Sequence, residues 1–362
     1  MSRVTVRLGA GRDYNVLVGR GMLEVLPKVI QTLEPSRVMV IADTRLASVA
    51  SRAVEELRLA GWNVASVLMR AGDRAKDLRH LSPLYGALIE HRMDRKSVVV
   101  ALGGGVVGDV AGFVAGTYLR GIRWVGVPST LVAQVDASIG GKTAVNHSRG
   151  KNLIGVFHQP AAVVCDTALL ATLGARDRVS GFAEMVKIGL AFDAAYFRRL
   201  VVGARSVLAL EPKALHDALT TALRWKARSV EKDERDTKGL RAKLNFGHTI
   251  GHALEVVTRY RFRHGEALVV GMRVAAAVSV VRGLLSQGEY GEIDSFLRTL
   301  KIPAVPLGLT LRELMPVLER DKKAECGKVR FVLLRGVGVG AGDDGVTQEQ
   351  LEQAFRMVGL EA

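Results

Sequence analysis

Residues 97–117 read SVVVALGGGVVGDVAGFVAGT and combine a short apolar run, a glycine-rich turn and the beginning of a helical pattern. The run Ser97–Leu102 has the unbroken apolar character of a strand that is buried on both faces. Gly103, Gly104 and Gly105 then let backbone N–H groups approach a phosphate, because no side chain stands in the way. The segment therefore predicts a strand, a nucleotide-binding turn and a helix over Val110–Thr117.

This turn fits the dinucleotide-binding pattern GxGxxG, but it departs from the usual placement of that pattern. It lies beyond residue 100 instead of after the first strand, and no acidic residue follows about twenty residues later. Asp43, at the end of an earlier apolar run, could accept hydrogen bonds from a ribose. A helix N-cap is the more common role for such an aspartate, and a tight turn without a ligand is the alternative for the glycines.

The first half of the chain alternates apolar runs with the helical patterns Leu46–Ala60 and Leu78–His91, which indicates a mostly parallel sheet covered on both faces. After about Gly174 the segments are mainly helical. We therefore expect an α/β Rossmann-like nucleotide-binding domain over residues 1–173 and a mainly α-helical domain over residues 174–362. The expected strands are Val4–Leu8, Tyr14–Val18, Arg37–Ala42, Val64–Met69, Ser97–Leu102, Arg123–Val127, Ala162–Cys165 and Val329–Leu334. The expected helices of the second domain are Ser180–Leu190, Ala194–Leu208, Pro212–Lys232, His248–Thr258, Glu266–Leu284 and Leu351–Val358.

Histidines and a carboxylate in the helical domain could hold a metal ion. His248 and His252 lie one helical turn apart on one face, and His264 follows twelve residues later. Upstream, Glu184 and Lys187 share one face of an apolar helix. A carboxylate with imidazoles suits Zn²⁺ or a similar ion. The spacing leaves open which histidines bind, and a surface pair without metal is the alternative for an isolated HxxxH.

Polar side chains also interrupt apolar stretches between these motifs. Residues 128–143 read PSTLVAQVDASIGGKT, and GKN follows at residues 150–152. Burying such groups is costly unless they are paired, and a multiply charged substrate would pair with them. A solvated surface charge is the alternative for any single lysine, although Lys142 and Lys151 each follow a glycine near an apolar run. Lys226, Arg241 and Asn245 add further candidates of this kind.

Composition restricts the classes of partner. The formal charge is +15, from 51 Lys and Arg against 36 Asp and Glu, but no run of five basic residues occurs and aromatic residues make up 5%. This pattern argues against a nucleic acid as the binding partner. The apolar stretch Ala267–Val281 is short and contains Arg273, so it predicts a buried helix and no membrane span. Two cysteines, Cys165 and Cys326, predict a cytoplasmic protein without structural disulfides.

Taken together and in this order, the motifs resemble those of 3-dehydroquinate synthases, members of the sugar phosphate cyclase superfamily. The similar segments are GGGVVGDVAGFVAGTYLRG, VPSTLVAQVDASIGGKTAVN, GKNLIGVFHQP, GFAEMVKIGL, LNFGHTIGHALE and HGEA. The resemblance implies a carbon–oxygen lyase of the shikimate pathway, which leads to chorismate and the aromatic amino acids. Such an enzyme converts 3-deoxy-D-arabino-heptulosonate 7-phosphate to 3-dehydroquinate and phosphate. The resemblance also implies NAD, a divalent metal (zinc or cobalt) and a homodimer.

The resemblance further implies a role for each matching position. The metal ligands would be Glu184, His248 and His264, which leaves His252 for the substrate. Arg120 would reach the site of the partner subunit in the dimer. Asp73 and Asp236 stand where the family has glutamate. The implied NAD contacts are Asp43, Asp73, Lys76, Gly104, Gly105, Val106, Asp109, Ser129, Thr130, Lys142, Lys151 and Thr172. The implied substrate contacts are Asp136, Lys142, Asn152, Lys187, Lys226, Arg241, Asn245 and one of Lys322 or Lys323.

Other functions remain as alternatives. Another sugar phosphate cyclase, of the aminodehydroquinate, deoxy-inosose or epi-valiolone type, would share most of the motifs. The segments GGKT and GFAE favour the dehydroquinate type over the last two, but do not separate the amino variant. A metal-dependent polyol dehydrogenase would give net NADH and has no need for Lys142, Asn152 and Arg241 together. A basic binding protein would bind polynucleotides in a salt-dependent manner.

Overall fold

The structure is a computed structural model and describes residues 1–70, 72, 75–148, 150–306, 309–320, 329–343 and 345–361, with only the backbone of Arg320. The described residues form two compact units. The first contains Met1–Thr172 and Lys226–Arg235, and the second contains Leu173–Trp225 and Asp236–Ala362. Helix α7 (Pro212–Lys232) thus contributes residues to both units. The domain limits expected from the sequence, 1–173 and 174–362, stay a prediction.

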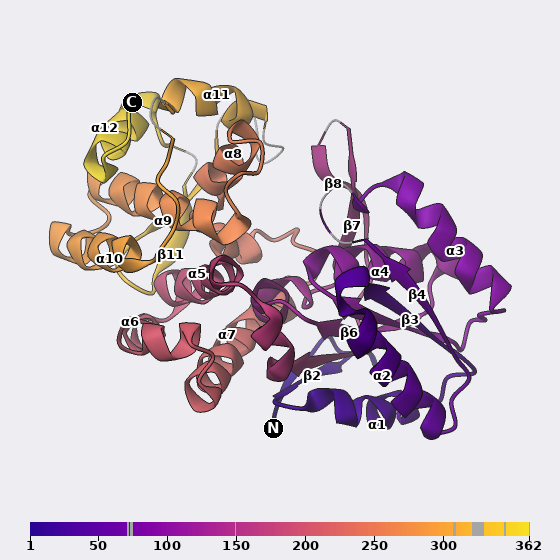
Figure 1. The fold of residues 1–362 in the computed structure, drawn as a ribbon. Helices are drawn as coiled ribbons and strands as arrows, with labels where there is room; N and C mark the ends of the chain where they lie inside the picture. The colour runs from indigo at the N-terminus through magenta and orange to yellow at the C-terminus, as the bar shows by residue number, and fades with distance from the viewer. Residues whose placement is uncertain are drawn as a thin grey trace. The chain divides into compact units, whose positions relative to one another are not determined.

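A sheet forms the centre of the first unit (Figure 1). Among the described residues it has seven strands in the order β1-β2-β9-β6-β5-β3-β4. β1 pairs antiparallel with β2, and the other neighbours pair in parallel, which confirms the mostly parallel sheet. The strands are β1 (Ser2–Val6), β2 (Tyr14–Gly19), β3 (Val38–Asp43), β4 (Val64–Met69), β5 (Val98–Gly103), β6 (Arg123–Pro128) and β9 (Ala162–Asp166).

Side chains of the central strands alternate between apolar cores on opposite faces of the sheet. Val38 and Val40 of β3 face the core that contains residues of α1 and α2. Met39 and Ile41 face the core that contains residues of α3 and α4. Figure 1 shows these helix pairs on opposite sides of the sheet, which explains why the strands are apolar throughout. The helices are α1 (Leu26–Gln31), α2 (Ala47–Leu59), α3 (Leu81–Glu90) and α4 (Gly105–Thr117).

Helix α4 begins at Gly105, five residues before the expected Val110, because glycines have low helix propensity and were assigned to the turn. Two later glycines of the helix, Gly112 and Gly116, lie where α4 packs closely on a hairpin that the sequence analysis did not predict. A Cβ on Gly112 would lie 2.5 Å from Thr143 Cγ2, and one on Gly116 would lie 2.8 Å from Val156 Cγ2. The hairpin pairs β7 (Lys142–His147) antiparallel with β8 (Gly150–Phe157).

Strand β1 ends at Val6, two residues before the expected Leu8. The reason is a turn in which the Asp13 side chain accepts hydrogen bonds from the backbone N–H groups of Leu8 and Gly9. The expected limits of β4 are confirmed at both ends, and those of β6 at its first residue.

The second unit is mainly helical and packs around α9 (His264–Val281), which contacts α5, α8, α10 and α12. By length and composition α9 could cross a membrane, but 78% of it is buried inside the protein, which confirms the buried core helix. Helices α10 and α11 and strand β11 were not expected from the sequence. The remaining elements are α5 (Ala175–Phe192), α6 (Ala194–Leu208), α8 (His248–Val257), α10 (Gln287–Thr299), α11 (Leu311–Arg320), α12 (Gln348–Val358), β10 (Phe331–Leu334) and β11 (Gly340–Asp343).

Because α4 packs tightly on the β7–β8 hairpin, adding a single methyl group to α4 at Gly112 should lower the stability of the protein. Gly112→Ala should lower the free energy of unfolding by about 1–3 kcal/mol, as overpacking commonly does, because the new Cβ would overlap Thr143. Thermal unfolding measures the change. Gly86→Ala in α3 is the matched control, since its Cβ would meet no described atom within 4 Å. It should stabilise the helix by about 0.5–1 kcal/mol; equal melting temperatures for the two variants would contradict the packing described.

Candidate active site

The carboxyl ends of β3 and β5 form a topological switch point in the first unit. These strands are neighbours, but the helix after β3 (α2) packs on one face of the sheet and the helix after β5 (α4) on the other. Ligands of open α/β sheets bind in the crevice that such a reversal creates. Asp43 ends β3 and Gly103 ends β5. The two sequence features assigned to nucleotide binding therefore lie at the carboxyl ends of adjacent strands.

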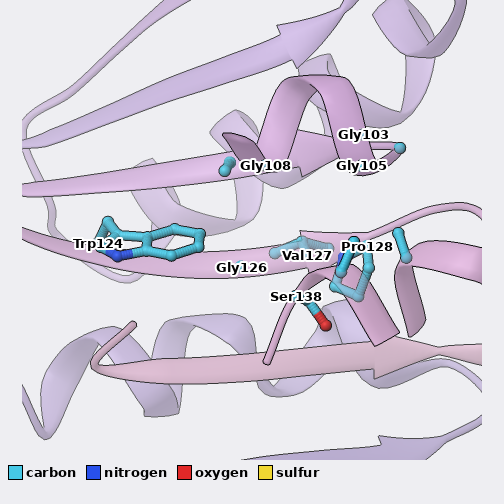
Figure 2. A pocket seen from close by; sticks show the side chains of 12 residues that line it. Gly103, Gly105, Gly108, Trp124, Gly126, Val127, Pro128 and Ser138 are labelled. Carbon is cyan, nitrogen blue, oxygen red and sulfur yellow. The ribbon is translucent and has the colours of Figure 1, made fainter. Parts of the chain in front are cut away.

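A small pocket adjoins the glycine turn at this edge (Figure 2). In the part of the chain that the structure describes, no side chain caps the N-terminus of α4, and its first turn contains no acidic residue. Its N–H groups and positive dipole end thus suit an anion such as a pyrophosphate. The pocket is lined by Ala101, Gly103, Gly104, Gly105, Gly108, Trp124, Gly126, Val127, Pro128, Ala133, Ala137 and Ser138.

Two buried lysines connect residues of the expected NAD and substrate sets. Lys76 Nζ lies 2.5 Å from Asp109 Oδ2 and 2.5 Å from Asn152 Oδ1, and Lys76 is only 5% exposed. Lys226 Nζ lies 2.5 Å from Asp136 Oδ1, which belongs to the π-helical turn η6 (Ala133–Ala137). The carboxylates compensate the cost of burying each ammonium group. The structure thus brings together residues that are up to 90 positions apart in the sequence.

Asp43 has a structural role in the first unit. Its carboxylate accepts hydrogen bonds from the backbone N–H and the guanidinium of Arg45, and it caps the turn that follows. The N-cap considered for Asp43 is therefore confirmed, and its contact with a ribose stays a prediction.

The other predicted residues of the first unit lie on several different elements. A Cβ on Gly104 would lie 3.1 Å from Thr130 Cγ2, so Thr130 and the buried Ser129 lie beside the turn. Lys142 is exposed at the start of β7, and Lys151 lies on β8. Val106 lies in the first turn of α4, Thr172 ends a 3₁₀ segment, and Arg120 is exposed with a left-handed backbone (φ 69°). Asp73, Lys322, Lys323 and Cys326 lie outside the described residues.

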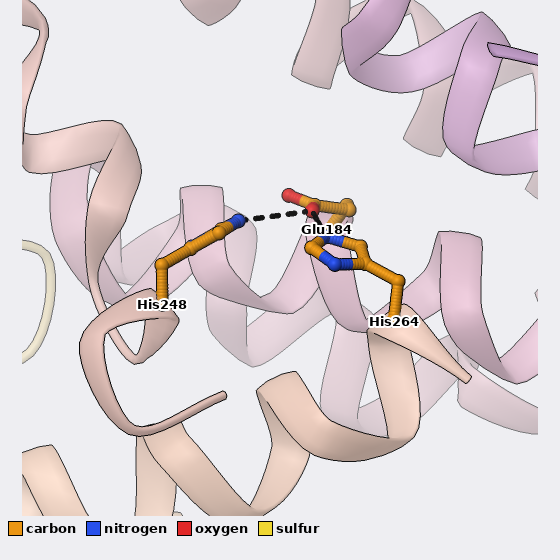
Figure 3. A group of neighbouring side chains, drawn as sticks. All are labelled: Glu184, His248 and His264. Carbon is orange, nitrogen blue, oxygen red and sulfur yellow. Dashed lines mark hydrogen bonds and ion pairs between the residues drawn. The ribbon is translucent and has the colours of Figure 1, made fainter. Parts of the chain in front are cut away.

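Glu184, His248 and His264 meet in the second unit (Figure 3). His264 Nε2 lies 2.8 Å and His248 Nε2 lies 3.5 Å from Glu184 Oε1. Figure 3 shows the imidazole rings approaching this carboxylate from opposite sides. One potential ligand atom from each residue lies within 4.8 Å of the others. A cation of the Zn²⁺ type fits such a donor set of two imidazoles and a carboxylate.

Glycines allow the helices that carry these residues to approach one another. Gly265 follows His264, and a Cβ there would lie 2.1 Å from the Cα atom of Ser180 in α5. On the other side of α9, a Cβ on Gly271 would lie 2.0 Å from the carbonyl oxygen of Gly247, the residue before His248. Neither contact can be relieved by rotating a side chain, because the atoms met belong to the backbone. Backbone contact at these positions therefore places His264 and His248 close to Glu184.

An ion pair with α5 also fixes the first turn of α9 in position. Arg176 of α5 binds both carboxylate oxygens of Glu266, at 2.5 and 2.7 Å. The Glu266 carboxylate also accepts the backbone N–H of Arg263, which precedes His264. The same helix, α5, thus supplies Glu184 and anchors the segment that carries His264.

The cluster perturbs the pKa values of its members. Burial raises the pKa of Glu184, but Lys187, His248 and His264 outweigh it and hold that pKa well below its usual range. Burial lowers the pKa of His264, but hydrogen bonds with Glu184 and Glu255 raise it to about 10. Burial and the Lys187 ammonium lower the pKa of His248. The carboxylate is therefore ionised, and a proton on His264 takes the place that a cation would take.

The sequence analysis missed Glu255. It is buried in α8, and its Oε1 lies 2.7 Å from His264 Nδ1. Its position seven residues after His248, two turns along the same helix face, was the available signal. His252 is exposed, with its ring centroid 5.1 Å from that of His248.

Arg241 and Asn245, expected to bind substrate, lie in the 3₁₀ segment η8 (Leu240–Asn245). Arg241 is buried, and η8 ends three residues before α8 begins at His248. Arg241 and Asn245 therefore lie in the same unit as the metal cluster.

Comparison with known proteins identifies the family. The family described as 3-dehydroquinate synthase N-terminal matches residues 66–180, and that described as 3-dehydroquinate synthase C-terminal matches residues 181–324. The chain belongs to the 3-dehydroquinate synthase family. This confirms the resemblance that the motifs indicated.

Relatives in this family match nearly the whole chain. The 3-dehydroquinate synthase of Pelobacter propionicus is 40% identical over 364 residues, covering 100% of both chains. That of Halorhodospira halophila is 44% identical over 337 residues, covering 92% of this chain and 93% of its own. That of Desulforamulus reducens is 41% identical over 343 residues, covering 93% of this chain and 95% of its own.

Solved structures of other cyclases share the fold. A 2-epi-5-epi-valiolone synthase from Streptomyces hygroscopicus, with NAD⁺ and Zn²⁺ bound, has a TM-score of 0.88 at 27% identity and covers 99% of both chains. A 2-deoxy-scyllo-inosose synthase, complexed with carbaglucose-6-phosphate, NAD⁺ and Co²⁺, has a TM-score of 0.88 at 26% identity, covering 98% of this chain and 99% of its own. The α/β domain followed by a mainly helical part is the fold of this group.

The raised pKa of His264 predicts how metal affinity depends on pH. An imidazole must lose its proton to bind a metal ion. Since this pKa is about 10 in the metal-free protein, Zn²⁺ must displace a proton at every pH below that value. The affinity for Zn²⁺ should therefore rise about tenfold per pH unit between pH 7 and pH 9, because one pKa unit is about 1.4 kcal/mol. Competition with a chelator, corrected for the protonation of the chelator, measures this; an affinity independent of pH over that range would contradict the assignment.

Proposed function

We propose that the protein converts 3-deoxy-D-arabino-heptulosonate 7-phosphate to 3-dehydroquinate and inorganic phosphate, with NAD and a divalent metal ion, zinc or cobalt, as cofactors. The observation that carries the proposal is the close approach of Glu184, His248 and His264 in a chain of this family. The switch-point crevice with the uncapped N-terminus of α4 supports the NAD site. When bound, NAD⁺ would supply reversible hydride transfer at C5 of the substrate, and a cation held by Glu184, His248 and His264 would supply stabilisation of negative charge on the hydroxyl oxygens of the substrate.

The residues of the chain would bind and orient a flexible, multiply charged substrate. Lys142, Asn152, Arg241 and Asn245 offer cationic and amide donors for its phosphate and carboxylate groups. Fixing both ends of an acyclic chain limits incorrect ring closures, since orientation contributes several kcal/mol. Their roles as substrate contacts follow from the family and from donor chemistry.

His252 is the proposed proton-transfer group. It is exposed beside the metal cluster, whereas His248 is buried there and His264 half-buried. A histidine in that position can move a proton at the carbon next to the departing phosphate, or on the phosphate itself. Lys187, which pairs with Glu184, keeps the buried carboxylate ionised.

The proposal also covers the location of the protein, its oligomeric state and the choice among related cyclases. The buried free thiol of Cys165 fits a reducing, cytoplasmic environment. A homodimer would allow Arg120 to contact the site of the partner subunit. The relatives at 40–44% identity are 3-dehydroquinate synthases, whereas the valiolone and inosose synthases are 27% and 26% identical, which favours the dehydroquinate reaction over those alternatives.

Release of inorganic phosphate from the heptulosonate ester tests the activity. It should require both NAD⁺ and metal, stop after chelation, and return with Zn²⁺ or Co²⁺. NADH should not accumulate, because the hydride returns to the substrate. Accumulation of NADH from a polyol without phosphate release would instead identify a dehydrogenase, and full activity after exhaustive chelation would contradict the metal site.

Substitutions separate the proposed roles. His264→Ala should greatly weaken metal binding, because it removes one of the ligands. Lys142→Ala should leave metal affinity unchanged and raise KM about 10- to 100-fold, since hydrogen bonds to charged groups contribute about 1.5–3 kcal/mol. Lys28→Ala, at an exposed lysine of α1, is the control and should change neither quantity. An unchanged KM in Lys142→Ala would remove that lysine from the substrate site.

A further inference from the structure

The imidazole of His264 lies between two carboxylates. Nε2 lies 2.8 Å from Glu184 Oε1, and Nδ1 lies 2.7 Å from Glu255 Oε1. A neutral imidazole has one N–H donor and one nitrogen lone pair. When a cation replaces one proton of His264, the two carboxylates would therefore have different tasks: one would share the cation with the lone pair, and the other would accept the N–H.

We propose that Glu255 is a positioning residue, which accepts a hydrogen bond from Nδ1–H of His264 and so directs the Nε2 lone pair toward Glu184 and His248. The inference rests on the proposed function, because it assigns Glu255 a task only if these residues bind a metal ion. Metal-binding histidines usually donate their other N–H to such an acceptor, which fixes the tautomer and the ring orientation.

The helix that carries Glu255 fixes its position. Glu255 lies in α8, two turns after His248, so one helix supplies both a candidate ligand and the carboxylate that orients another ligand. Gly251 lies between them and allows α8 to pack closely on α9, since a Cβ there would lie 3.3 Å from the carbonyl oxygen of Ala267. Glu255 is 6% exposed, and a buried carboxylate is costly unless a charged or polar group pairs with it.

An alternative is that Glu255 itself binds the metal ion. One potential ligand atom each from His252, Glu255 and His264 also lies within 4.8 Å of the others. However, His252 is exposed, whereas Glu184 and His248 are both buried. His248 Nε2 and His264 Nε2 also face the same carboxylate oxygen of Glu184, at 3.5 and 2.8 Å. The buried cluster around Glu184 thus directs two imidazole nitrogens at one oxygen, which favours Glu184 as the ligand and positioning as the role of Glu255.

Zn²⁺ affinity of the full chain tests this proposal. Metal-stripped protein is titrated with Zn²⁺ against a chromophoric chelator, and thermal unfolding of each metal-free variant is measured alongside. Glu255→Gln keeps the size of the side chain and an oxygen acceptor, so it should weaken Zn²⁺ binding about tenfold; Glu255→Ala should weaken it up to about 100-fold, the range found for such partners. If Glu255→Ala does not fold, the isosteric Glu255→Gln carries the test.

Glu289→Gln is the matched control. The Glu289 carboxylate also accepts hydrogen bonds, from Ser286 in the capping box of α10 and from the backbone N–H of Val337, so this variant should lose some stability and keep its Zn²⁺ affinity. Wild-type affinity in both Glu255 variants would overturn the inference alone. If both Glu255 variants lose Zn²⁺ binding while His248→Ala binds Zn²⁺ normally, Glu255 is itself a metal ligand. That result would also overturn the inference. A wild-type protein that binds no Zn²⁺ would overturn the proposed function together with the inference.

Discussion

The backbone contact between α9 and its neighbours is the constraint on which the metal cluster depends. Gly265 lets the first turn of α9 lie directly against α5, and Gly271 lets its third turn lie against the residue before α8. Three potential ligands from segments far apart in the sequence, Glu184, His248 and His264, then come within bonding range of one ion. Any side chain at these glycines would separate the helices by more than a metal–ligand bond tolerates, because the atoms that it would meet cannot move aside.

Electrostatics explains how the metal cluster accommodates a buried carboxylate. The buried Glu184 carboxylate is compensated by the Lys187 ammonium and by a proton held on His264. Without these partners the buried carboxylate would be strongly destabilising. The same principle holds in the first unit, where Asp109 and Asp136 compensate two buried lysines. In both units, each of these buried charges is thus paired with a group of opposite charge.

Much of the fold could be predicted from the sequence, because strands buried on both faces are apolar throughout and the glycine turn marks the end of β5. The β7–β8 hairpin was missed, since its hydroxyl, amide and lysine side chains are typical of a loop and its packing partner, α4, is rich in glycine. Helix α10 was missed although Ser286 and Glu289 form a capping box. Spacing could place Glu255 on the same helix face as His248, but its contact with His264 depends on the packing of α8 against α9, which local spacing does not reveal.

Anomalous diffraction from crystals of the full chain grown with Co²⁺ would test most directly whether one ion joins these helices. The account predicts a Co²⁺ peak about 2.0–2.2 Å from a carboxylate oxygen of Glu184 and from imidazole nitrogens of His248 and His264. A peak bound by other residues, or no peak between α5, α8 and α9 at saturating Co²⁺, would contradict it.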